Sequence, residues 1–280
     1  MNNRTDLAVE RFPENSSGNV HINNRRGIFS VTEIILDDDS YFDTLGKSKG
    51  RYVTLEGNDL AVFSDDYEKM ITELAEEIRK FIPDGDILVV GLGNRDITPD
   101  ALGNMVSAKI LATRHLENEL ENDSDNFLQS LRRVSTFAGG VLGQTGIESA
   151  EIIQAVCGQI KPAGIIAVDA LACADVSRLG TTIQISDSGI SPGSGVANAR
   201  KELSEKSIGV PVIAIGVPTV IDTHTIIRNA TGKEPENFPD MMVTSREIDR
   251  LIERSSQLIA YGINLALQPS LTIEDVKALF

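Results

Sequence analysis

The sequence predicts an α/β fold in which a mainly parallel, twisted sheet carries helices on both faces and an added β-hairpin segment. Short apolar runs that are typical of buried strands occur at residues 87–90, 165–168 and 212–215. Apolar residues recur at helical spacing over residues 67–81 and 246–267. Because such strands and helices alternate along the chain, the sheet is expected to be covered on both faces.

The amino-terminal quarter predicts a tail followed by further strands. Residues 1–25 are polar and show little periodicity, so we expect a mobile or loosely attached tail. Residues 28–36 alternate weakly and predict a strand. Two further strands over 51–56 and 60–63 flank Gly57-Asn58-Asp59, which is typical of a hairpin turn.

The rest of the chain alternates helices and strands. The helix over 67–81 is stopped by Pro83-Asp84-Gly85, and the strand over 87–90 follows. Further helices are expected over 101–115, 148–160 and 246–267, further strands over 165–168, 182–185 and 212–215, and an exposed acidic loop over 118–130. Thr272-Ile273-Glu274-Asp275 resembles a capping box and predicts a short last helix.

Composition and charge narrow the class of protein. The chain has 280 residues, 41% of them hydrophobic, which is enough for one large domain or two small ones. Its net charge of −15 disfavours nonspecific binding to nucleic acid or to anionic membranes. No apolar run reaches the ~18 residues of a membrane span, and the start lacks the apolar core of a signal peptide. We therefore expect a soluble, cytoplasmic protein whose partners include neither nucleic acid nor membrane.

The sequence contains no recognisable motif for a metal or a cofactor. Cys157 and Cys173 lack metal-ligand spacing, and in a cytoplasmic protein they are expected to be buried, reduced thiols. Asp222-Thr223-His224 offers suitable ligand types, but no H-E-x-x-H or comparable pattern accompanies it. We therefore expect no metal and no cofactor, and a metal site that includes His224 stays the weaker alternative.

The most informative residues are two aspartates, Asp100 and Asp169. Asp100 follows the strand over 87–90 after a short loop, and Asp169 comes directly after the strand over 165–168. In open α/β sheets, the binding crevice lies outside the carboxyl ends of the parallel strands. If the two strands are neighbours, both carboxylates reach one crevice, where they suit general acid–base chemistry on a water molecule.

The loop before Asp100 begins with Gly91-Leu92-Gly93-Asn94, for which two interpretations exist. A tight turn would hold Asn94 and Asp100 in the crevice, whereas a phosphate-binding turn would make the protein a non-catalytic nucleotide-binding module. The second interpretation is weaker, because a third glycine is missing and Asp100 would repel phosphate. At a helix start, Asp100 is expected to have a lowered pKa or to act simply as an N-cap.

A second polar loop follows the strand over 182–185. Asp187 and Ser188 open this Ser- and Gly-rich segment, which must be irregular. Both are candidates for shaping a substrate groove, and a turn-forming role for Asp187 is equally compatible with the sequence.

Several long blocks carry a resemblance to a known family. They comprise residues 4–10 (RTDLAVE), 91–103, 140–148, 168–172, 182–195 and 211–222. With these blocks, which extend over most of its length, the chain resembles the germination proteases of spore-forming bacteria. These endopeptidases degrade small acid-soluble spore proteins when a spore germinates.

The resemblance implies a mechanism, an assembly and a location. The family is similar in fold to hydrogenase maturation proteases, is regarded as an unusual aspartic-type peptidase and forms homotetramers. Its two essential aspartates fall on Asp100 and Asp169. The resemblance further implies location in the spore core and small acid-soluble spore proteins as substrate. The maturation proteases suggest an alternative, a metal-dependent protease that uses Asp100, Asp169 and His224.

The family is made as a self-processing zymogen, and its substrates are cut after the first Glu of a Thr/Ser-Glu-Phe/Ile-Ala-Ser-Glu site. Residues 5–10 (TDLAVE) have the same layout, so we predict processing between Asp6 and Leu7. Residues 1–6 would then form a short prosegment and residues 7–280 a single protease domain. Arg95, Arg132 and Arg133 are candidates for binding the substrate acids. Asn94 or backbone N–H groups over 188–195 are candidates for stabilising an oxyanion.

Overall fold

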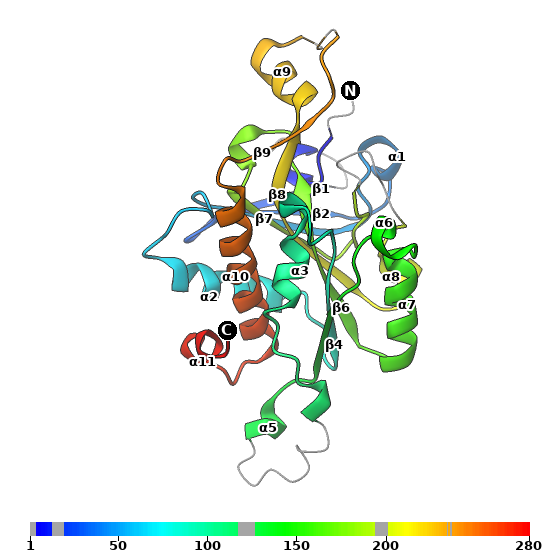
Figure 1. The fold of residues 1–280 in the computed structure, drawn as a ribbon, viewed down its shortest axis with the longest axis vertical. Helices are drawn as coiled ribbons and strands as arrows, with labels where there is room; N and C mark the ends of the chain where they lie inside the picture. Colours follow the sequence, from blue (N-terminus) through cyan, green and yellow to red (C-terminus); the bar gives the residue numbers. More distant parts are fainter. Residues whose placement is uncertain (1–3, 13–19, 117–126, 194–200, 234, 236) are drawn as a thin grey trace.

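A single mixed sheet organises the protein in a computed structural model that describes residues 4–12, 20–116, 127–193, 201–233, 235 and 237–280. The strands follow the order β1-β2-β3-β7-β8-β6-β4-β5, and β9 pairs with β8 (Figure 1). Their bounds are β1 Val20–Arg26, β2 Ser30–Leu36, β3 Gly50–Glu56, β4 Ile87–Gly91, β5 Val134–Ala138, β6 Gly164–Ala172, β7 Thr182–Ser186, β8 Val212–Asp222 and β9 Met242–Thr244.

The sheet has a parallel half and an antiparallel half. Strands β5, β4, β6 and β8 are parallel, whereas β1, β2, β3 and β7 are joined to one another and to β8 by antiparallel pairing. The predicted α/β class is confirmed, but the antiparallel portion is larger than a hairpin segment. The predicted hairpin over 51–63 is wrong, because residues 60–63 form no strand and β3 pairs with β2 and β7 instead.

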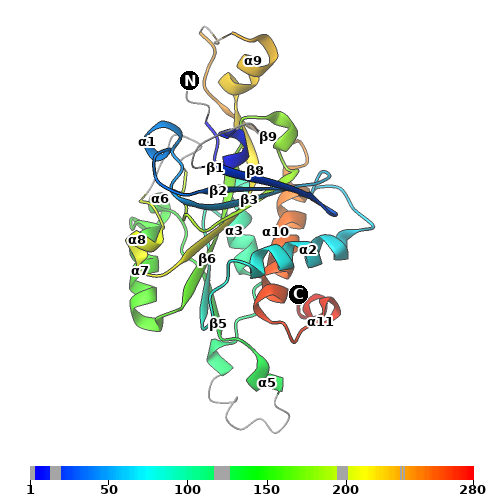
Figure 2. The same cartoon turned by 180° about the vertical axis from the view of Figure 1, so that it is seen from behind.

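Helices cover both faces of the sheet (Figures 1 and 2). The longer ones are α2 (Tyr67–Arg79), α3 (Leu102–Ser107), α7 (Ser149–Ile160), α9 (Thr223–Thr231), α10 (Ile248–Leu267) and α11 (Ile273–Leu279). The short ones are α1 (Phe42–Leu45), α5 (Phe127–Ser130), α6 (Leu142–Thr145) and α8 (Glu205–Ile208), with 3-10 turns η1 (Ala8–Glu10), η2 (Thr98–Asp100), η3 (Arg114–Leu116) and η4 (Val176–Arg178).

Alternate residues of the central strands supply two cores. On β6, Ile166 and Val168 face the larger core, which α2, α3 and α10 complete. Ile165 and Ala167 face the opposite core beneath α7. Burial of such side chains on both faces explains the continuous apolar runs of β4 and β6 in the sequence. Asp169 extends the series of Ile165 and Ala167, so its carboxylate lies on the α7 face, within the second half of β6.

The amino-terminal segment is not a loosely attached tail. Leu7 and Ala8 are completely buried and Phe12 nearly so. Leu7 packs with Leu171, Cys173 and Ile221 beyond the central strands, and Val20 already begins β1. Polar composition predicted mobility here, but the buried apolar contacts with distant strands outweigh it. Residues 1–3 and 13–19 lie outside the described residues.

Most other predicted elements occur, with changes in length. Helices α2, α7 and α10 match their predictions, and the side chain of Thr272 caps α11 as the sequence predicts. Strands β6 and β8 continue beyond the predicted 165–168 and 212–215. The predicted helix over 101–115 ends at Ser107, and the following backbone bonds instead to the buried side chain of Asn264. The predicted acidic loop falls mostly on residues 117–126, outside the described residues.

Cys157 and Cys173 are both buried, as the sequence predicts. Within the described ranges, none of the helices has the length and apolar character that crossing a membrane requires.

Candidate active site

A cavity of about 490 Å³ opens at the carboxyl ends of β4, β6 and β8. Asp100 and Asp169 both line it, together with Asn94, Thr219 and Asp6 of the amino-terminal segment. The sequence predicts that the two aspartates share one crevice, and β4 and β6 are indeed parallel neighbours. The cavity therefore combines two carboxyl groups with a segment of the chain's own amino terminus.

Close backbone packing brings Asp100 beside the end of β6. A Cβ atom on Gly103 would lie 2.2 Å from the carbonyl oxygen of Val168 in β6. A Cβ on Gly93 would lie 2.1 Å from the carbonyl oxygen of Asp100, and Gly93 has a left-handed φ of 90°. Only glycine permits these approaches without displacement of the backbone. The predicted tight turn after β4 is therefore present.

Hydrogen bonds fix this turn from three sides. The backbone N–H of Asn94 donates to Asp100 Oδ2 at 2.7 Å. The side-chain amide of Asn104 donates to the carbonyl of Gly93 at 2.9 Å. From β8, the hydroxyl of Thr219 donates to the carbonyl of Pro99 at 2.7 Å. Because the Asn94 N–H already binds a carboxylate, the turn does not offer that donor to a phosphate, which weakens the nucleotide-binding interpretation.

Asp169 is the more deeply buried carboxyl group, with 4% of its surface exposed. Its Oδ1 accepts the backbone N–H of Ala170 at 3.0 Å. Burial, followed by the negative charges of Asp100 and Asp6, raises the pKa of Asp169 well above its usual range. Asp169 therefore favours the protonated form.

Asp100 differs from its prediction in one respect. Burial raises the pKa of Asp100, and the hydrogen bond from Asn94 only partly opposes this effect. The predicted lowering of its pKa by a helix dipole is wrong, because Asp100 lies in the 3-10 turn η2 and Ala101 is the N-cap of α3. Two neighbouring carboxyl groups with raised pKa values can share one proton, so that one acts as acid while the other acts as base.

Among the other predicted residues, Asn94 lies at the cavity, and its side-chain oxygen accepts from Gln144 at 2.7 Å. Asp187 does not line this cavity; its carboxylate accepts the backbone N–H of Arg51 at 2.7 Å and ties the end of β7 to β3. Ser188 lines a second, adjacent cavity. His224 lies on α9, where its ring meets the carbonyl of Phe238 at 2.9 Å, outside the aspartate cavity.

In the part of the chain that the structure describes, there is no group of three His, Cys, Asp or Glu side chains that could hold a metal ion. The predicted alternative set of Asp100, Asp169 and His224 is therefore not assembled, since His224 stands apart. Asp222, next to it, caps α9 by accepting the N–H of Thr225 at 2.9 Å.

The amino-terminal segment docks beside β6 through its predicted processing site. The N–H of Asp6 donates to the carbonyl of Ala172 at 2.9 Å, and the carboxylate of Asp6 accepts the N–H of Ala172 at 2.8 Å. The N–H of Leu7 donates to the hydroxyl of Thr5 at 3.0 Å. The carbonyl of Asp6 accepts from Lys47 and Gln184. The Asp6–Leu7 peptide bond is therefore held firmly from several sides.

Glu10 occupies a separate site for a carboxylate. Its two oxygens accept the N–H groups of Ala174 at 2.7 Å and Asp175 at 2.8 Å, just after β6. The guanidinium of Arg178 lies 3.7 Å from it, and the Thr5 hydroxyl also donates to it. The residues of this site were not predicted from the sequence, although the acid at position 10 of the RTDLAVE block was a signal for it.

The arginines that were candidates for binding substrate acids do not line the cavity of the two aspartates. Arg132 donates to the carbonyl of Pro83 at 2.7 Å, and Arg133 pairs with Asp86 at 2.7 Å. These contacts lie at the starts of β4 and β5, opposite the cavity. Arg95 lines a different hollow beside α10.

Comparison with known proteins identifies the family. Residues 3–232 match the sequence model of the family described as Germination protease. The chain belongs to the germination protease family. A germination protease of Clostridium tetani is 39% identical over 99% of both chains. That of Bacillus subtilis is 44% identical over 82% of this chain and 62% of its own length.

Family membership makes the chain an endopeptidase of spore germination. One solved structure, a [NiFe] hydrogenase maturation protease HycI from Thermococcus kodakarensis KOD1, is similar with a TM-score of 0.38 and 20% identity. It covers 67% of this chain and 98% of that protein.

The buried carboxyl of Asp169 makes stability depend on pH. Because its folded-state pKa is raised, the neutral carboxyl of Asp169 contributes to the free energy of unfolding. This contribution is fully present below the unfolded-state pKa of about 3.9, and it is lost as pH rises through the folded-state pKa. Asp169→Asn stays neutral, so its melting temperature should exceed that of the wild type by a margin that grows from pH 5 to pH 8.

Melting curves by circular dichroism at several pH values measure this margin. Asp84→Asn, at an exposed position, is the matched control for loss of one negative charge. A margin for Asp169→Asn that shrinks with rising pH would contradict the assignment of Asp169 as the proton-holding group.

Proposed function

We propose that this germination protease is an aspartic-type endopeptidase that processes itself between Asp6 and Leu7 and then cleaves small acid-soluble spore proteins in the spore core. Residues 1–6 act as prosegment, and residues 7–280 form the protease domain. The active protein is proposed to be a homotetramer. The molar mass of the purified protein, measured by light scattering, tests this assembly. Asp100 and Asp169 are the proposed catalytic pair.

One observation carries this proposal. Asp6, the residue before the predicted cut, lines the same cavity as Asp100 and Asp169. The charge of Asp6 also contributes to the raised pKa of Asp169, which requires that the two groups be close. The bond expected to be cut therefore lies beside the groups expected to cut it.

The chemistry follows from the different environments of the two carboxyl groups. The ionised Asp100 takes a proton from a water molecule, whose oxygen attacks the carbonyl carbon of Asp6. The neutral Asp169 provides the proton that the nitrogen of Leu7 requires when the C–N bond breaks. The products are a carboxyl group on Asp6 and an amine on Leu7. The pair still holds one proton, now on Asp100, and its transfer to Asp169 restores the starting state.

The contacts of the segment explain the layout of the substrate site. The Thr5 hydroxyl binds the N–H of the bond to be cut, Leu7 and Ala8 fill closed pockets, and the Glu10 carboxylate is bound near Arg178. A hydroxyl, an apolar residue, a small residue and a second acid are therefore each matched by a specific contact. We infer that free substrates bind in the same register once the segment has left the groove.

Cleavage of a peptide that contains Thr-Glu-Phe-Ala-Ser-Glu tests the catalytic pair. Wild-type protein should cut it after the first Glu, and Asp100→Asn and Asp169→Asn should each lower kcat by about 10²–10⁴-fold, because each loses proton transfer. Product masses and initial rates measure the effect, and melting temperatures verify that the variants are folded.

The same assay with a chelator separates the aspartic mechanism from the metal-dependent alternative. Rates that do not change with chelator support two carboxyl groups acting on water. Loss of activity with chelator, restored by added metal, would overturn the aspartic assignment.

Processing of the full chain gives a second test. Intact protein should lose its first six residues and show Leu7 as the new amino terminus, because the Asp6–Leu7 bond is the one held at the cavity. Edman sequencing or intact-mass spectrometry identifies the terminus. In Asp169→Asn the terminus should stay intact, and a matured wild type that starts at another residue would refute the predicted site.

The proposed acid subsite makes a prediction about Arg178. Processed protein with Arg178→Met should cleave the hexapeptide site with a kcat/KM lowered about 2–5-fold, as expected for losing an ion-pair partner whose Nε lies 3.7 Å from the bound carboxylate. Replacing the second Glu of the peptide by Gln should lower kcat/KM for the wild type similarly. If the decrease in kcat/KM for the variant acting on the altered peptide equals the product of the two single decreases, Arg178 does not bind that acid. The inferred register would then be wrong.

A further inference from the structure

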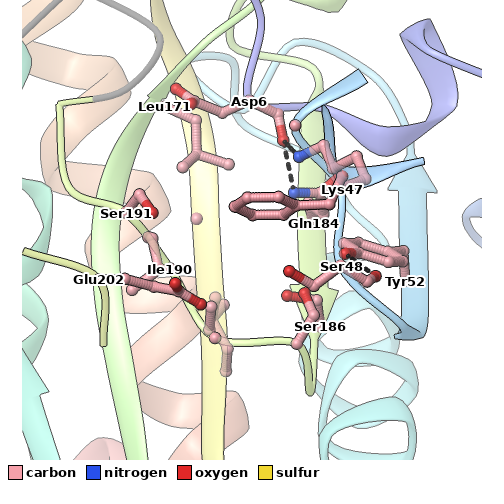
Figure 3. A pocket seen from close by; sticks show the side chains of 17 residues that line it. Asp6, Lys47, Ser48, Tyr52, Leu171, Gln184, Ser186, Ile190, Ser191 and Glu202 are labelled. Atoms are coloured by element: carbon pink, nitrogen blue, oxygen red, sulfur yellow. Dashed lines mark hydrogen bonds between the residues drawn. The ribbon is translucent and has the colours of Figure 1, made fainter. Parts of the chain in front are cut away.

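We propose that Lys47 and Gln184 bind the carbonyl oxygen of the bond being cut and stabilise the negative charge that develops on it. This inference rests on the proposed function, because it takes Asp6–Leu7 as the bond that is cleaved. The two residues are far apart in sequence, since Lys47 follows α1 and Gln184 lies in the middle of β7. Figure 3 shows both side chains converging on Asp6.

The geometry is that of two donors aimed at one acceptor. Lys47 Nζ lies 2.6 Å from the carbonyl oxygen of Asp6, and Gln184 Nε2 lies 3.0 Å from the same atom. Such distances match those of the groups that stabilise oxyanions in acyl transfer. The donors lie in a second cavity of about 260 Å³, which shares Asp6 and Leu171 with the cavity of the two aspartates. The carbonyl of Asp6 thus points toward the two donors.

Gln184 contacts the chain on both sides of the bond. Its Nε2 donates to the carbonyl of Asp6, while its Oε1 accepts the N–H of Ala8 at 2.6 Å. Gln184 is only 7% exposed and lies in a strand between buried Ile183 and Ile185. A polar side chain buried in this way is costly unless both ends are satisfied. Here the segment that carries the bond satisfies both.

Lys47 brings positive charge to a half-buried position. Its ammonium lies 5.5 Å from the centre of the Tyr52 ring. Burial lowers the pKa of Lys47 to about 8, while the carboxylates of Asp6 and Glu10 oppose this effect and Arg11 adds to it. Lys47 is therefore still mostly protonated near neutral pH, and it loses its charge as pH rises through about 8.

The proposed step balances without any further reactant. When water attacks the carbonyl carbon of Asp6, the electron pair of the C=O bond moves to the oxygen, which becomes negative beside Lys47 and Gln184. When the bond to the nitrogen of Leu7 breaks, the pair returns to re-form the C=O bond. Lys47 and Gln184 neither gain nor lose a proton in this sequence.

The test is self-cleavage of the full chain, because the tether already holds the bond in place and the rate reports the chemical step. Intact-mass spectrometry follows loss of residues 1–6 in the wild type, Lys47→Met and Gln184→Glu. Gln184→Glu keeps the acceptor for Ala8 but loses the donor to Asp6. Lys49→Met is the matched control, since Lys49 is an exposed lysine in the same turn.

Lys47→Met and Gln184→Glu should each cleave about 10²–10³-fold more slowly than the wild type at pH 7, and Lys49→Met should cleave at the wild-type rate. The ratio of wild-type to Lys47→Met rates should fall as pH rises through about 8, because the wild type then loses the charge that the variant lacks. A purely structural role for Lys47 would leave that ratio independent of pH.

Three outcomes overturn the inference. If Lys47→Met cleaves within about threefold of the wild type, or if the ratio of rates does not depend on pH, Lys47 does not stabilise the oxygen. If Lys47→Met fails to fold, Gln184→Glu decides, and wild-type rates in that variant refute the pair. If cleavage is lost in Asp100→Asn and Asp169→Asn while both donor variants cleave at the wild-type rate, the proposed function stays intact and only this inference is removed.

Discussion

The site depends on one steric constraint, the close packing of the loop and helix that follow β4 against β6. Gly103 in α3 leaves room for the carbonyl oxygen of Val168 in β6, and Gly93 leaves room for the carbonyl oxygen of Asp100. This packing places Asp100, which is half-buried, and Asp169, which is buried, at one cavity. Burial then decides the chemistry, because two desolvated carboxyl groups cannot both ionise easily. The glycines thereby influence how many protons the two carboxyl groups hold, without contacting a substrate.

The sequence predicted the parts of the molecule that obey local periodicity. The strands β4 and β6 are buried on both faces, so they stand out as apolar runs, and their parallel pairing carries Asp100 and Asp169 to one edge. The antiparallel half was underestimated, because β1 and β2 are weakly patterned and depend on pairing partners distant in sequence. The docking of Leu7 likewise depends on β6 and β8, which no local pattern reveals.

The site itself was predictable only where a residue type and a strand end coincided. Lys47 lies in a turn and Gln184 is a single polar residue in an apolar strand, so neither spacing nor composition distinguished them. The raised pKa of Asp100 was missed for a related reason, since the degree of burial is a property of the assembled fold and not of a helix start. Arg178, and none of the expected arginines, lies near Glu10, because the amino-terminal segment runs beside β6 and not along the opposite edge of the sheet.

The complete burial of Leu7 has a consequence for the protein after cleavage. The cut would turn its neutral amide nitrogen into an amino terminus that is charged at neutral pH, on a residue whose side chain packs with Leu171, Cys173 and Ile221. An isolated ammonium group is poorly tolerated in such surroundings. The reaction would thus leave a well-packed, neutral segment with a charged end that is poorly solvated. The freshly made terminus would be driven toward water, leaving its pocket vacant for the next chain.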